Sequence, residues 1–235
     1  MRLDKFLGSC GLGSRKQLKE YVKNGMVTVD GEVVSKSDIN IDPAKNEIIF
    51  SGENLTENYK EFRYYLLNKP QGVVSATRDN HDETVLDLID VGFDNNLAPV
   101  GRLDKDTEGL LIITNDGKLA HKLLSPKKHV EKEYEVHTRD PLSDKDIKKL
   151  EEGVDIGDDE PTLPAKSFIE NTDGEDVLHL IIHEGRFHQV KRMLEAVGNE
   201  VVFLRRIRMG GLVLDPDLKP GEYRELSDEE LKLLK

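Results

Sequence analysis

The densest group of side chains that could do chemistry lies in the stretch GRLDKDTEGLLIITNDG, residues 101–117. Three carboxylates, Asp104, Asp106 and Glu108, and two basic residues fall within nine positions, directly before an apolar run. A carboxylate that a nearby cation keeps ionised can act as a nucleophile. A solvated turn with capping acids would have the same composition, so both interpretations are open at this point.

The sequence excludes several other kinds of active site. A glycine-rich phosphate loop is absent, because GRLDKDTEG lacks both the terminal Lys-Ser/Thr pair and the GxGxxG spacing. His183 and His188 are five residues apart, one too many for two zinc ligands on one helical face, and a single cysteine, Cys10, cannot form a cysteine-based metal site. No G-x-S-x-G serine motif occurs. Carboxylate chemistry beside basic groups remains.

Length and composition are those of a soluble globular protein with one large domain, or with a domain and a small module. The chain has 235 residues, of which 37% are hydrophobic and 34% are charged. No run approaches the roughly 18 apolar residues of a membrane span, and the N-terminus has no signal-peptide core. Cys10 alone excludes an internal disulfide. We therefore expect a cytoplasmic protein that has no membrane partner and acts as a monomer.

The net charge of −12 argues at first against a nucleic-acid partner, but the charge is unevenly distributed. Residues 1–45 hold eight Lys and Arg against six Asp and Glu, and residues 185–208 hold six against two. The acidic residues gather elsewhere, in runs such as DIGDDE at 155–160. Because salt screens a charge beyond roughly 8–10 Å, local basic regions can bind phosphates on an acidic protein.

The first 59 residues are expected to form a small module of two short helices and a hairpin. Ser14 and Gln17 have the spacing of a capping box for a helix that Gly25 ends, and the basic residues of that helix gather on one face. MVTVDGEVV, residues 26–34, predicts a hairpin with an Asp-Gly turn. The polar stretch SGENLTENYKE, residues 51–61, is interpreted as a linker because it lacks apolar periodicity.

Residues 60–235 predict a larger α+β domain on a mainly antiparallel sheet, because strand-like runs occur with a few helices and without a repeated βαβ pattern. The expected strands are RYYLLN, GVVSAT, GLLIIT, KEYEVHT, AKSFIE, VLHLIIH and EVVFLRRIR. The expected helices span about 84–90, 117–124, 143–152 and 187–197, with Thr84 and Ser143 as caps of the first and third.

Residues 2–31 resemble the S4 RNA-binding domain through the pattern RLDKFL, SR and VTVDG. The resemblance implies that residues 1–59, linker included, form a small S4-type α/β RNA-binding domain. It also implies which residues contact RNA there: Arg2, Ser14, Arg15, Lys16, Lys19 and Lys23.

A second family resemblance rests on four further segments of the chain. These segments are LNKPQGVVSA (67–76), GRLDKDTEGLLIITNDG (101–117), EKEYEV (131–136) and EGRFHQVKRML (184–194). Together they resemble the pseudouridine synthases of the small-subunit ribosomal type, the RsuA-like family, over essentially the whole chain. The resemblance implies that residues 60–235 are the catalytic domain and that Asp104 is the nucleophile. A flipped-out uridine is then converted to pseudouridine through a covalent bond to this carboxylate, without a metal or other cofactor. Asp106 and Glu108 are left as turn and capping acids.

Three other residues acquire roles around Asp104. On a helix over 187–197, Lys191 lies at the border of the apolar face and can reach into a site as the cation beside Asp104, a pairing that the resemblance also implies. Tyr134 matches the family's base-stacking tyrosine, and Arg102 matches the arginine that fills the space left by the flipped base. The other basic residues expected to meet RNA are Arg186, Arg192, Arg206 and Arg208.

The resemblance implies a ribosomal RNA substrate. LPAKSFIE and EGRFHQVKRMLEAVGNEV favour the 16S rRNA of a bacterial small subunit, free or in an assembly intermediate, over 23S rRNA. A non-catalytic S4-type RNA-binding assembly factor is the alternative from another class, and the joint presence of Asp104, Tyr134 and Lys191 argues against it. An N-glycoside hydrolase would use the same carboxylates but release free uracil. Lys69 and Pro70 are interpreted as a structural turn near the site.

Overall fold

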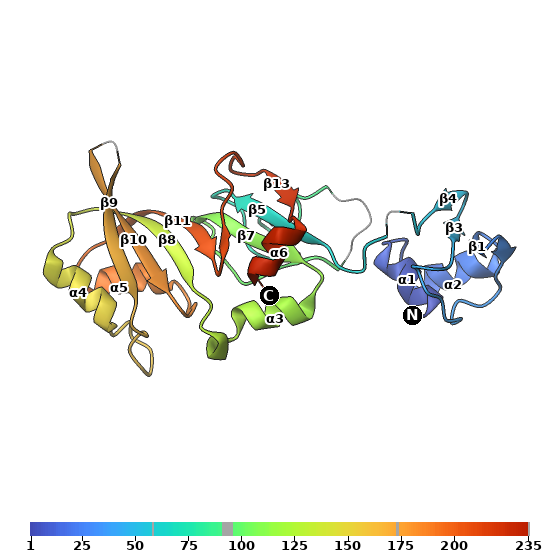
Figure 1. Cartoon of the computed structure of the whole chain (residues 1–235), viewed down its shortest axis with the longest axis horizontal. Helices are drawn as coiled ribbons and strands as arrows, with labels where there is room; N and C mark the ends of the chain where they lie inside the picture. The colour runs from blue at the N-terminus through green and yellow to red at the C-terminus, as the bar shows by residue number, and fades with distance from the viewer. Residues whose placement is uncertain (58, 91–95, 173, 235) are drawn as a thin grey trace. The chain divides into compact units, whose positions relative to one another are not determined.

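The chain forms two compact units in the computed structural model, which describes residues 1–57, 59–90, 96–172 and 174–234 (Figure 1). The first unit consists of Met1–Arg63 with Asp90–Leu97, and the second of Tyr64–Ile89 with Ala98–Lys235. Each unit has a hydrophobic core of its own. Within these described ranges no helix has the length and apolar character that crossing a bilayer requires. The assignment of residues 1–59 to RNA binding and of residues 60–235 to catalysis stays a prediction.

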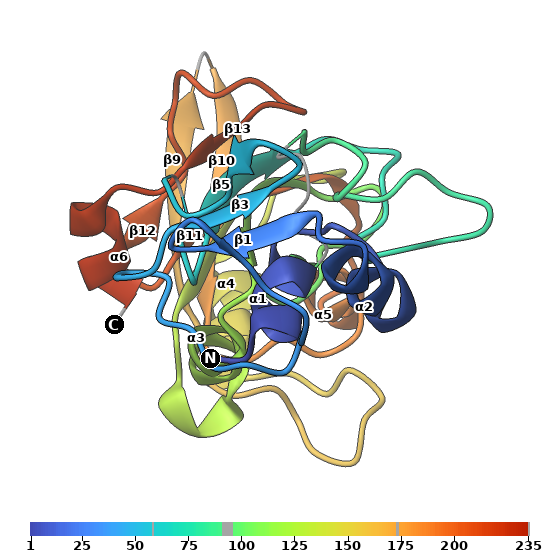
Figure 2. The same ribbon diagram turned by 90° about the vertical axis from the view of Figure 1, so that its right-hand side faces the viewer.

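In the N-terminal unit, two helices and a four-stranded antiparallel sheet share one core (Figure 2). The helices are α1 (Leu3–Ser9) and α2 (Arg15–Lys23). The strands, in the order β2-β1-β3-β4, are β1 (Val27–Val29), β2 (Glu32–Val33), β3 (Ile48–Phe50) and β4 (Glu53–Asn54).

The predictions of a capping box and of a hairpin in this unit are confirmed. Ser14 and Gln17 cap each other's backbone at the start of α2, and Gly25 follows the helix with a φ of +73°. Asp30 and Gly31 join β1 to β2, and both have the positive φ that a tight hairpin turn requires.

The prediction of a linker over residues 51–61 is wrong for most of this stretch. Strand β4 lies within it, and the Leu55 amide donates to the Ile48 carbonyl at 2.8 Å. The Tyr59 ring packs against Phe6, with ring centroids 4.8 Å apart. Leu55 and Tyr59 are the only large apolar residues in this polar stretch, so the sequence shows no hydrophobic periodicity there, although both side chains pack against the core of the unit.

A nine-stranded sheet forms the C-terminal unit (Figure 1). Its main path runs β13-β5-β7-β11-β8-β10-β9, with β6 paired to β7 and β12 paired to β11. Every described pair is antiparallel except β7 with β11, which confirms the expected α+β class and mainly antiparallel sheet. The strands are β5 (Tyr64–Lys69), β6 (Ala98–Pro99), β7 (Glu108–Thr114), β8 (Lys132–Thr138), β9 (Lys166–Thr172), β10 (Glu175–Ile182), β11 (Val201–Met209), β12 (Leu212–Val213) and β13 (Tyr223–Glu225).

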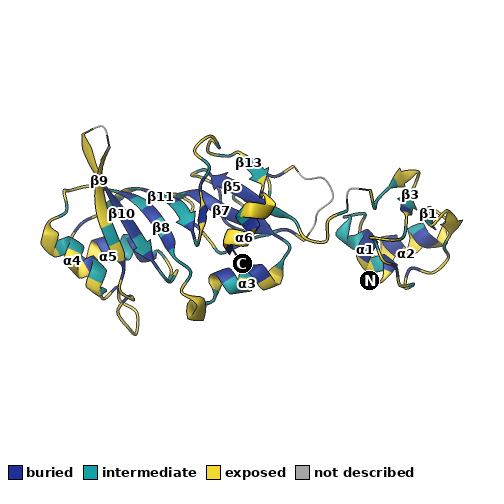
Figure 3. Ribbon diagram, viewed as in Figure 1, coloured by how far each residue is buried: buried dark blue, intermediate teal, exposed yellow. Residues whose placement is uncertain are grey.

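Four α-helices and a short 3-10 helix, Pro126–Lys128, accompany this sheet in the described residues. Helices α3 (Gly117–Leu124) and α6 (Asp228–Leu234) each place two leucines in one core with β5 and β7, namely Leu119, Leu123, Leu231 and Leu234. Helix α4 (Asp144–Glu152) lies beside β9, and α5 (Gln189–Ala196) follows β10. The central strands are buried, while the outer faces of the helices are exposed (Figure 3).

Two predicted elements of this unit are absent. GVVSAT forms no strand, since only Val74 makes an isolated bridge, to Thr84. Residues 84–90 form turns instead of a helix: Thr84 donates its amide and hydroxyl to Asp87 at 2.8 Å, as a helix cap would, but only three-residue backbone hydrogen bonds follow, from Asp87 to Thr84 and from Ile89 to Leu86. The short strands β6, β12 and β13 and the terminal helix α6 were not predicted.

A buried lysine joins the end of β5 to the turn that precedes β7. The Lys69 side chain has no exposed surface, and its Nζ donates to the carbonyls of Pro70 and Thr107, both at 2.9 Å, and of Lys105 at 3.4 Å. Burial lowers the pKa of Lys69 to about 8, although the nearby negative charges of Asp106, Asp104 and Glu108 oppose the shift. One ammonium group thus fixes the backbone beneath the acid-rich turn.

A glycine allows β7 and β11 to approach each other as the parallel pair. Gly109 lies opposite Arg206 and has a φ of +102°. A Cβ atom at this position would lie 2.2 Å from the Arg206 carbonyl oxygen. No side chain fits between the two backbones, so this glycine is required where β7 leaves the acid-rich turn.

Gly109→Ala should destabilise the C-terminal unit by more than about 2 kcal/mol, because it combines a steric clash with a left-handed backbone. Gly117→Ala is the matched control, since a Cβ in the first turn of α3 meets nothing within 4 Å and alanine favours the helix. Urea denaturation of both variants measures the difference. Equal unfolding free energies would contradict the role given to Gly109.

Lys69→Met should change how stability depends on pH. Because folding lowers the pKa of Lys69 from 10.5 to about 8, the unfolded chain holds a proton between these values that the folded protein has released. The unfolding free energy of the wild type should therefore rise, relative to that of Lys69→Met, as the pH increases from 8 to 10. Urea denaturation across this range measures the trend, and Lys148→Met, which removes an exposed lysine, controls for net charge. A difference that does not vary with pH would contradict the prediction.

Candidate active site

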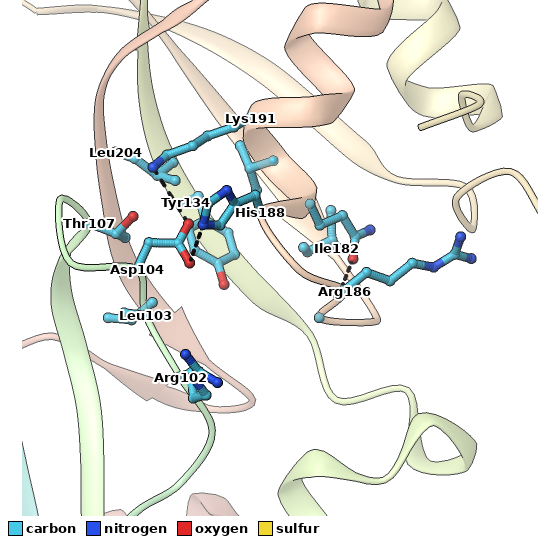
Figure 4. Close-up of a pocket in the computed structure, with 13 residues that line it drawn as sticks. Arg102, Leu103, Asp104, Thr107, Tyr134, Ile182, Arg186, His188, Lys191 and Leu204 are labelled. Carbon is cyan, nitrogen blue, oxygen red and sulfur yellow. Dashed lines mark hydrogen bonds and ion pairs between the residues drawn. The ribbon is translucent and has the colours of Figure 1, made fainter. Parts of the chain in front are cut away.

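A pocket in the C-terminal unit collects the residues that the sequence singled out. It is lined by the turn before β7, by β8 and β11, and by the segment that connects β10 to α5 (Figure 4). Arg102, Asp104, Tyr134, His188 and Lys191 all line it, with apolar side chains between them. Three of the predicted catalytic residues, Asp104, Tyr134 and Lys191, are therefore brought together from segments up to 87 positions apart in the chain.

The backbone around Asp104 is held from two sides. The Ser75 hydroxyl donates to the Leu103 carbonyl at 2.8 Å and accepts from the Leu103 amide at 3.0 Å. On the other side, the Thr107 amide closes the turn by donating to the Asp104 carbonyl at 3.0 Å, and Lys69 binds the Thr107 carbonyl. The Asp104 carboxylate is thus presented on a turn that belongs to the core, and its side chain is about one quarter exposed.

Lys191 supplies positive charge to two carboxylates. Its Nζ lies 3.6 Å from Oδ2 of Asp104 and 2.5 Å from Oδ1 of Asp106. Partial burial raises the pKa of Asp106, but the hydrogen bond and charge of Lys191, together with His188, outweigh it and hold this pKa below its usual range. Asp106 lies in the turn, as expected, and it also shares the Lys191 cation with Asp104.

His188 is a site residue that the sequence analysis missed. Its Nε2 lies 3.6 Å from Oδ1 of Asp104, so the two oxygens of this carboxylate face different basic groups (Figure 4). In the sequence, the spacing of His188 from His183 excludes a paired zinc site and assigns His188 no other role, and the helix is expected to start at residue 187. Helix α5 begins at Gln189 instead, and His188 precedes it with a φ of +48°. Its position three residues before Lys191 was the available signal, since this spacing places both side chains on one side of a helix start.

The remaining pocket residues form a wall and a rim. Tyr134, in the middle of β8, is buried between its neighbours Leu180 and Arg206 on the adjacent strands, and its ring faces the pocket that Asp104 also lines. Arg102 is exposed at the pocket. Thr107, which also lines it, has a buried hydroxyl with no hydrogen-bond partner in the described part of the chain. In the same residues no group of three or more His, Cys, Asp or Glu is arranged to hold a metal ion.

Arg206 and Arg208 form hydrogen bonds and ion pairs with neighbouring strands of the sheet. Arg206 is 2% exposed and donates its Nε to the Leu110 carbonyl at 2.9 Å, so the prediction that it contacts RNA is wrong. Arg208 pairs with Glu133 at 2.7 Å and with Glu131 at 3.1 Å. Strand alternation alone predicts that Arg206 and Arg208 share a side, but a β-bulge between them puts Arg206 opposite Tyr134 and Arg208 opposite Glu133, so the two side chains leave the strand on different faces.

Arg186 and Arg192 fasten the acidic loop 155–161 to α5. Arg192 pairs with Asp158 at 2.7 Å, and Arg186 reaches the same carboxylate at 3.5 Å. Their other N–H groups donate to backbone carbonyls of Ile156, Phe187, Glu160 and Pro161. The positive charge of residues 185–208 is therefore balanced by an acidic run about 30 positions away, and few donors of these arginines remain for RNA.

The N-terminal unit presents its basic residues differently. Arg2 pairs with Asp4 at 2.6 Å, and the Ser14 hydroxyl is engaged in the capping box of α2. The basic side chains of α2 are exposed, and they are Arg15, Lys16, Lys19 and Lys23.

Comparison with known proteins agrees with both parts of the chain. The family model for RNA pseudouridylate synthases matches residues 63–196, and the S4 domain matches residues 1–44. The chain is 52% identical over 238 residues to the RNA pseudouridine synthase YtzG of Bacillus subtilis, covering 100% of this chain and 98% of the relative. It is 41% identical over 231 residues to ribosomal small subunit pseudouridine synthase A of Escherichia coli, covering 98% of each.

A solved structure of the same kind extends the agreement to three dimensions. The crystal structure of a pseudouridylate synthase, 40% identical in sequence, superposes over 100% of both chains with a TM-score of 0.69. The family model covers more than half of the chain, and the relatives match it from end to end. The chain therefore belongs to the RNA pseudouridine synthases of the RsuA type, enzymes that carry an S4 domain before their catalytic domain.

Proposed function

We propose that the protein isomerises a specific uridine of small-subunit (16S) ribosomal RNA to pseudouridine, as a cytoplasmic monomer. The observation that carries the proposal is the Asp104 carboxylate, fixed on a core-bound turn, flanked by Lys191 and His188 and opening into a pocket walled by Tyr134. The small-subunit target rests on the 41% identity to the Escherichia coli enzyme whose name states that substrate.

Asp104 is the covalent catalyst in this proposal. Its carboxylate attacks either C1′ of the ribose or C6 of the uracil, and the C1′–N1 bond breaks. The uracil turns in the pocket, a C1′–C5 bond forms, the carboxylate is released, C5 loses its proton, and N1 takes up a proton in place of its former bond to C1′. The reaction is an isomerisation without net oxidation, so the residues present suffice. Lys191, 3.6 Å from the Asp104 carboxylate, supplies a positive charge beside it where the RNA phosphates would add negative charge.

Tyr134 and the exposed cations bind the RNA. The uridine must leave its stack to reach Asp104, and the Tyr134 ring replaces part of the lost stacking. Arg102, exposed at the pocket, occupies the space that the base vacates. The exposed basic face of α2 contacts the RNA backbone away from the reacting base.

Tritium release from small-subunit rRNA labelled with [5-³H]uridine tests the function, because loss of the C5 hydrogen requires catalysis. Mapping of pseudouridine then identifies the modified position. Release from large-subunit rRNA alone would move the target to 23S rRNA. Binding without release would indicate a non-catalytic assembly factor, and free uracil would indicate a glycoside hydrolase.

Asp104→Asn should keep the fold and the RNA affinity but abolish tritium release, because the nearly isosteric amide is no nucleophile. Asp106→Asn is the matched control from the same turn and should retain most of the activity, since it leaves Lys191 free to serve Asp104. Circular dichroism and RNA binding verify that both variants are folded. If Asp104→Asn keeps more than about one per cent of the wild-type rate, Asp104 is not the nucleophile. If Asp106→Asn is then the inactive variant, the assignment moves to Asp106.

Lys191→Met should lower the single-turnover rate by roughly 10- to 100-fold while RNA affinity changes little, because the stem is kept and only the charge beside Asp104 is removed. Single-turnover kinetics at saturating RNA and affinity across a salt series measure the two effects on one variant. A phosphate-binding lysine would behave in the opposite way, with intact chemistry and a salt slope smaller by about one. That result would overturn the Asp104–Lys191 pairing.

A further inference from the structure

An exposed aromatic side chain lies next to the pocket and is not explained by the reaction. Phe187 is 71% exposed, the highest value among the exposed large hydrophobic residues in the described part of the chain. It lies in the short connection between β10 and α5, directly before His188. A single exposed apolar side chain is ordinary on a protein surface, and what distinguishes Phe187 is the way its ring is held beside the pocket.

The Phe187 ring is held in place by its neighbours. It stacks on the His188 ring with centroids 3.8 Å apart and an interplanar angle of 18°. The Phe187 carbonyl accepts a hydrogen bond from Nε of Arg192 at 2.8 Å, and Arg192 is itself bound to Asp158. The Gln189 side chain accepts from the Arg186 amide at 2.9 Å and so fixes the other side of the connection. The aromatic pair is therefore preorganised, which reduces the entropy lost when a ligand stacks on it.

The inner member of the pair contacts the catalytic carboxylate. His188 Nε2 lies 3.6 Å from Asp104 Oδ1, and the left-handed backbone of His188, φ +48°, is a conformation that a non-glycine residue rarely adopts (Figure 4). The stack thus leads from Asp104 outward to the open face of Phe187. Tyr134 is buried in the pocket and suits the flipped base, whereas Phe187 lies outside and suits a neighbour of that base.

The surroundings of Phe187 favour a nucleotide over a protein partner. Its chain neighbours are polar or basic, and a protein docking site needs a contiguous apolar patch of several hundred Å². A single aromatic ring beside cations is the arrangement on which unpaired bases stack. We propose that the Phe187–His188 stack is a second base-binding site, which holds an unpaired base adjacent to the flipped uridine. This inference rests on the proposed function for the identity of its ligand.

The chain offers a matched control in a second exposed stack. Phe168 stacks on His179 with centroids 4.5 Å apart and an interplanar angle of 12°, and it is 48% exposed. His179, however, lies between Glu133 and Glu170, each 3.1 Å away, so this stack is surrounded by acidic groups. It lines no part of the Asp104 pocket. The two stacks share their geometry and differ in location, since only the Phe187–His188 stack borders the Asp104 pocket.

Tryptophan substitution provides a direct readout, because the chain contains no tryptophan. Phe187→Trp and Phe168→Trp, each in the full chain, are titrated with an unmodified small-subunit rRNA transcript and with sodium polyphosphate, which carries charge but no bases. Filter retention confirms RNA binding in parallel. We expect the emission of Phe187→Trp to be quenched severalfold by the transcript and unchanged by polyphosphate. Phe168→Trp should respond to neither. Emission of Phe187→Trp that stays constant in the presence of the transcript would overturn the proposal.

Activity supplies a second, independent measurement. Phe187→Ala should lower kcat/KM for tritium release roughly tenfold, the effect of losing one stacked base, whereas Phe187→Tyr and Phe168→Ala should behave like the wild type. Full activity of Phe187→Ala, together with unquenched emission of Phe187→Trp, would overturn the base-binding site and make a protein the remaining candidate partner for Phe187. If the wild type releases no tritium while Phe187→Trp is quenched, the proposed function fails and the base-binding site stands.

Discussion

The position of the Asp104 carboxylate depends on one buried ammonium group. A sharp turn leaves carbonyl groups that no strand can pair with, and burying them without donors would cost free energy. Lys69 donates to two carbonyls of this turn, those of Lys105 and Thr107, and to the Pro70 carbonyl directly after β5, while Ser75 holds the segment just before Asp104. Because Lys69 belongs to β5 and the turn leads into β7, the central strands and the turn that carries Asp104 are joined directly. The Asp104 carboxylate is carried by the core rather than by a surface loop.

The charges of the pocket are arranged as a shared system. Lys191 contacts Asp104 and Asp106, and His188 contacts the other oxygen of Asp104. Both carboxylates therefore lie beside basic side chains, and Lys191 offsets part of their negative charge where RNA phosphates would approach. The Arg186–Asp158–Arg192 bridge then fixes the connection that carries His188 and the start of α5. Geometry and electrostatics of the site therefore depend on each other.

Local signals in the sequence identified most of the fold and part of the site. The capping box of α2, the Asp30–Gly31 turn and the long apolar runs of β5, β7 and β10 depend on neighbours in the chain, and all were predicted correctly. The segment from Leu55 to Tyr59, the bridge at Val74 and the burial of Arg206 depend on contacts between distant segments, and there the predictions failed. His188 was missed for the same reason. Its importance comes from a partner 84 positions earlier and from a helix that starts one residue after it.

The internal use of the arginines has a consequence for how the protein senses ionic strength. Residues already bonded to carboxylates and carbonyls release few counterions when RNA arrives. In the proposed function, the counterion release falls mainly on the exposed cations of α2 and on Arg102, about five groups, which corresponds to a slope of roughly −4 in log affinity against log salt concentration. The Asp104–Lys191 pair is partly shielded within the pocket and is screened much less. Capture of RNA is therefore sensitive to salt, whereas the isomerisation of bound RNA is nearly insensitive to it.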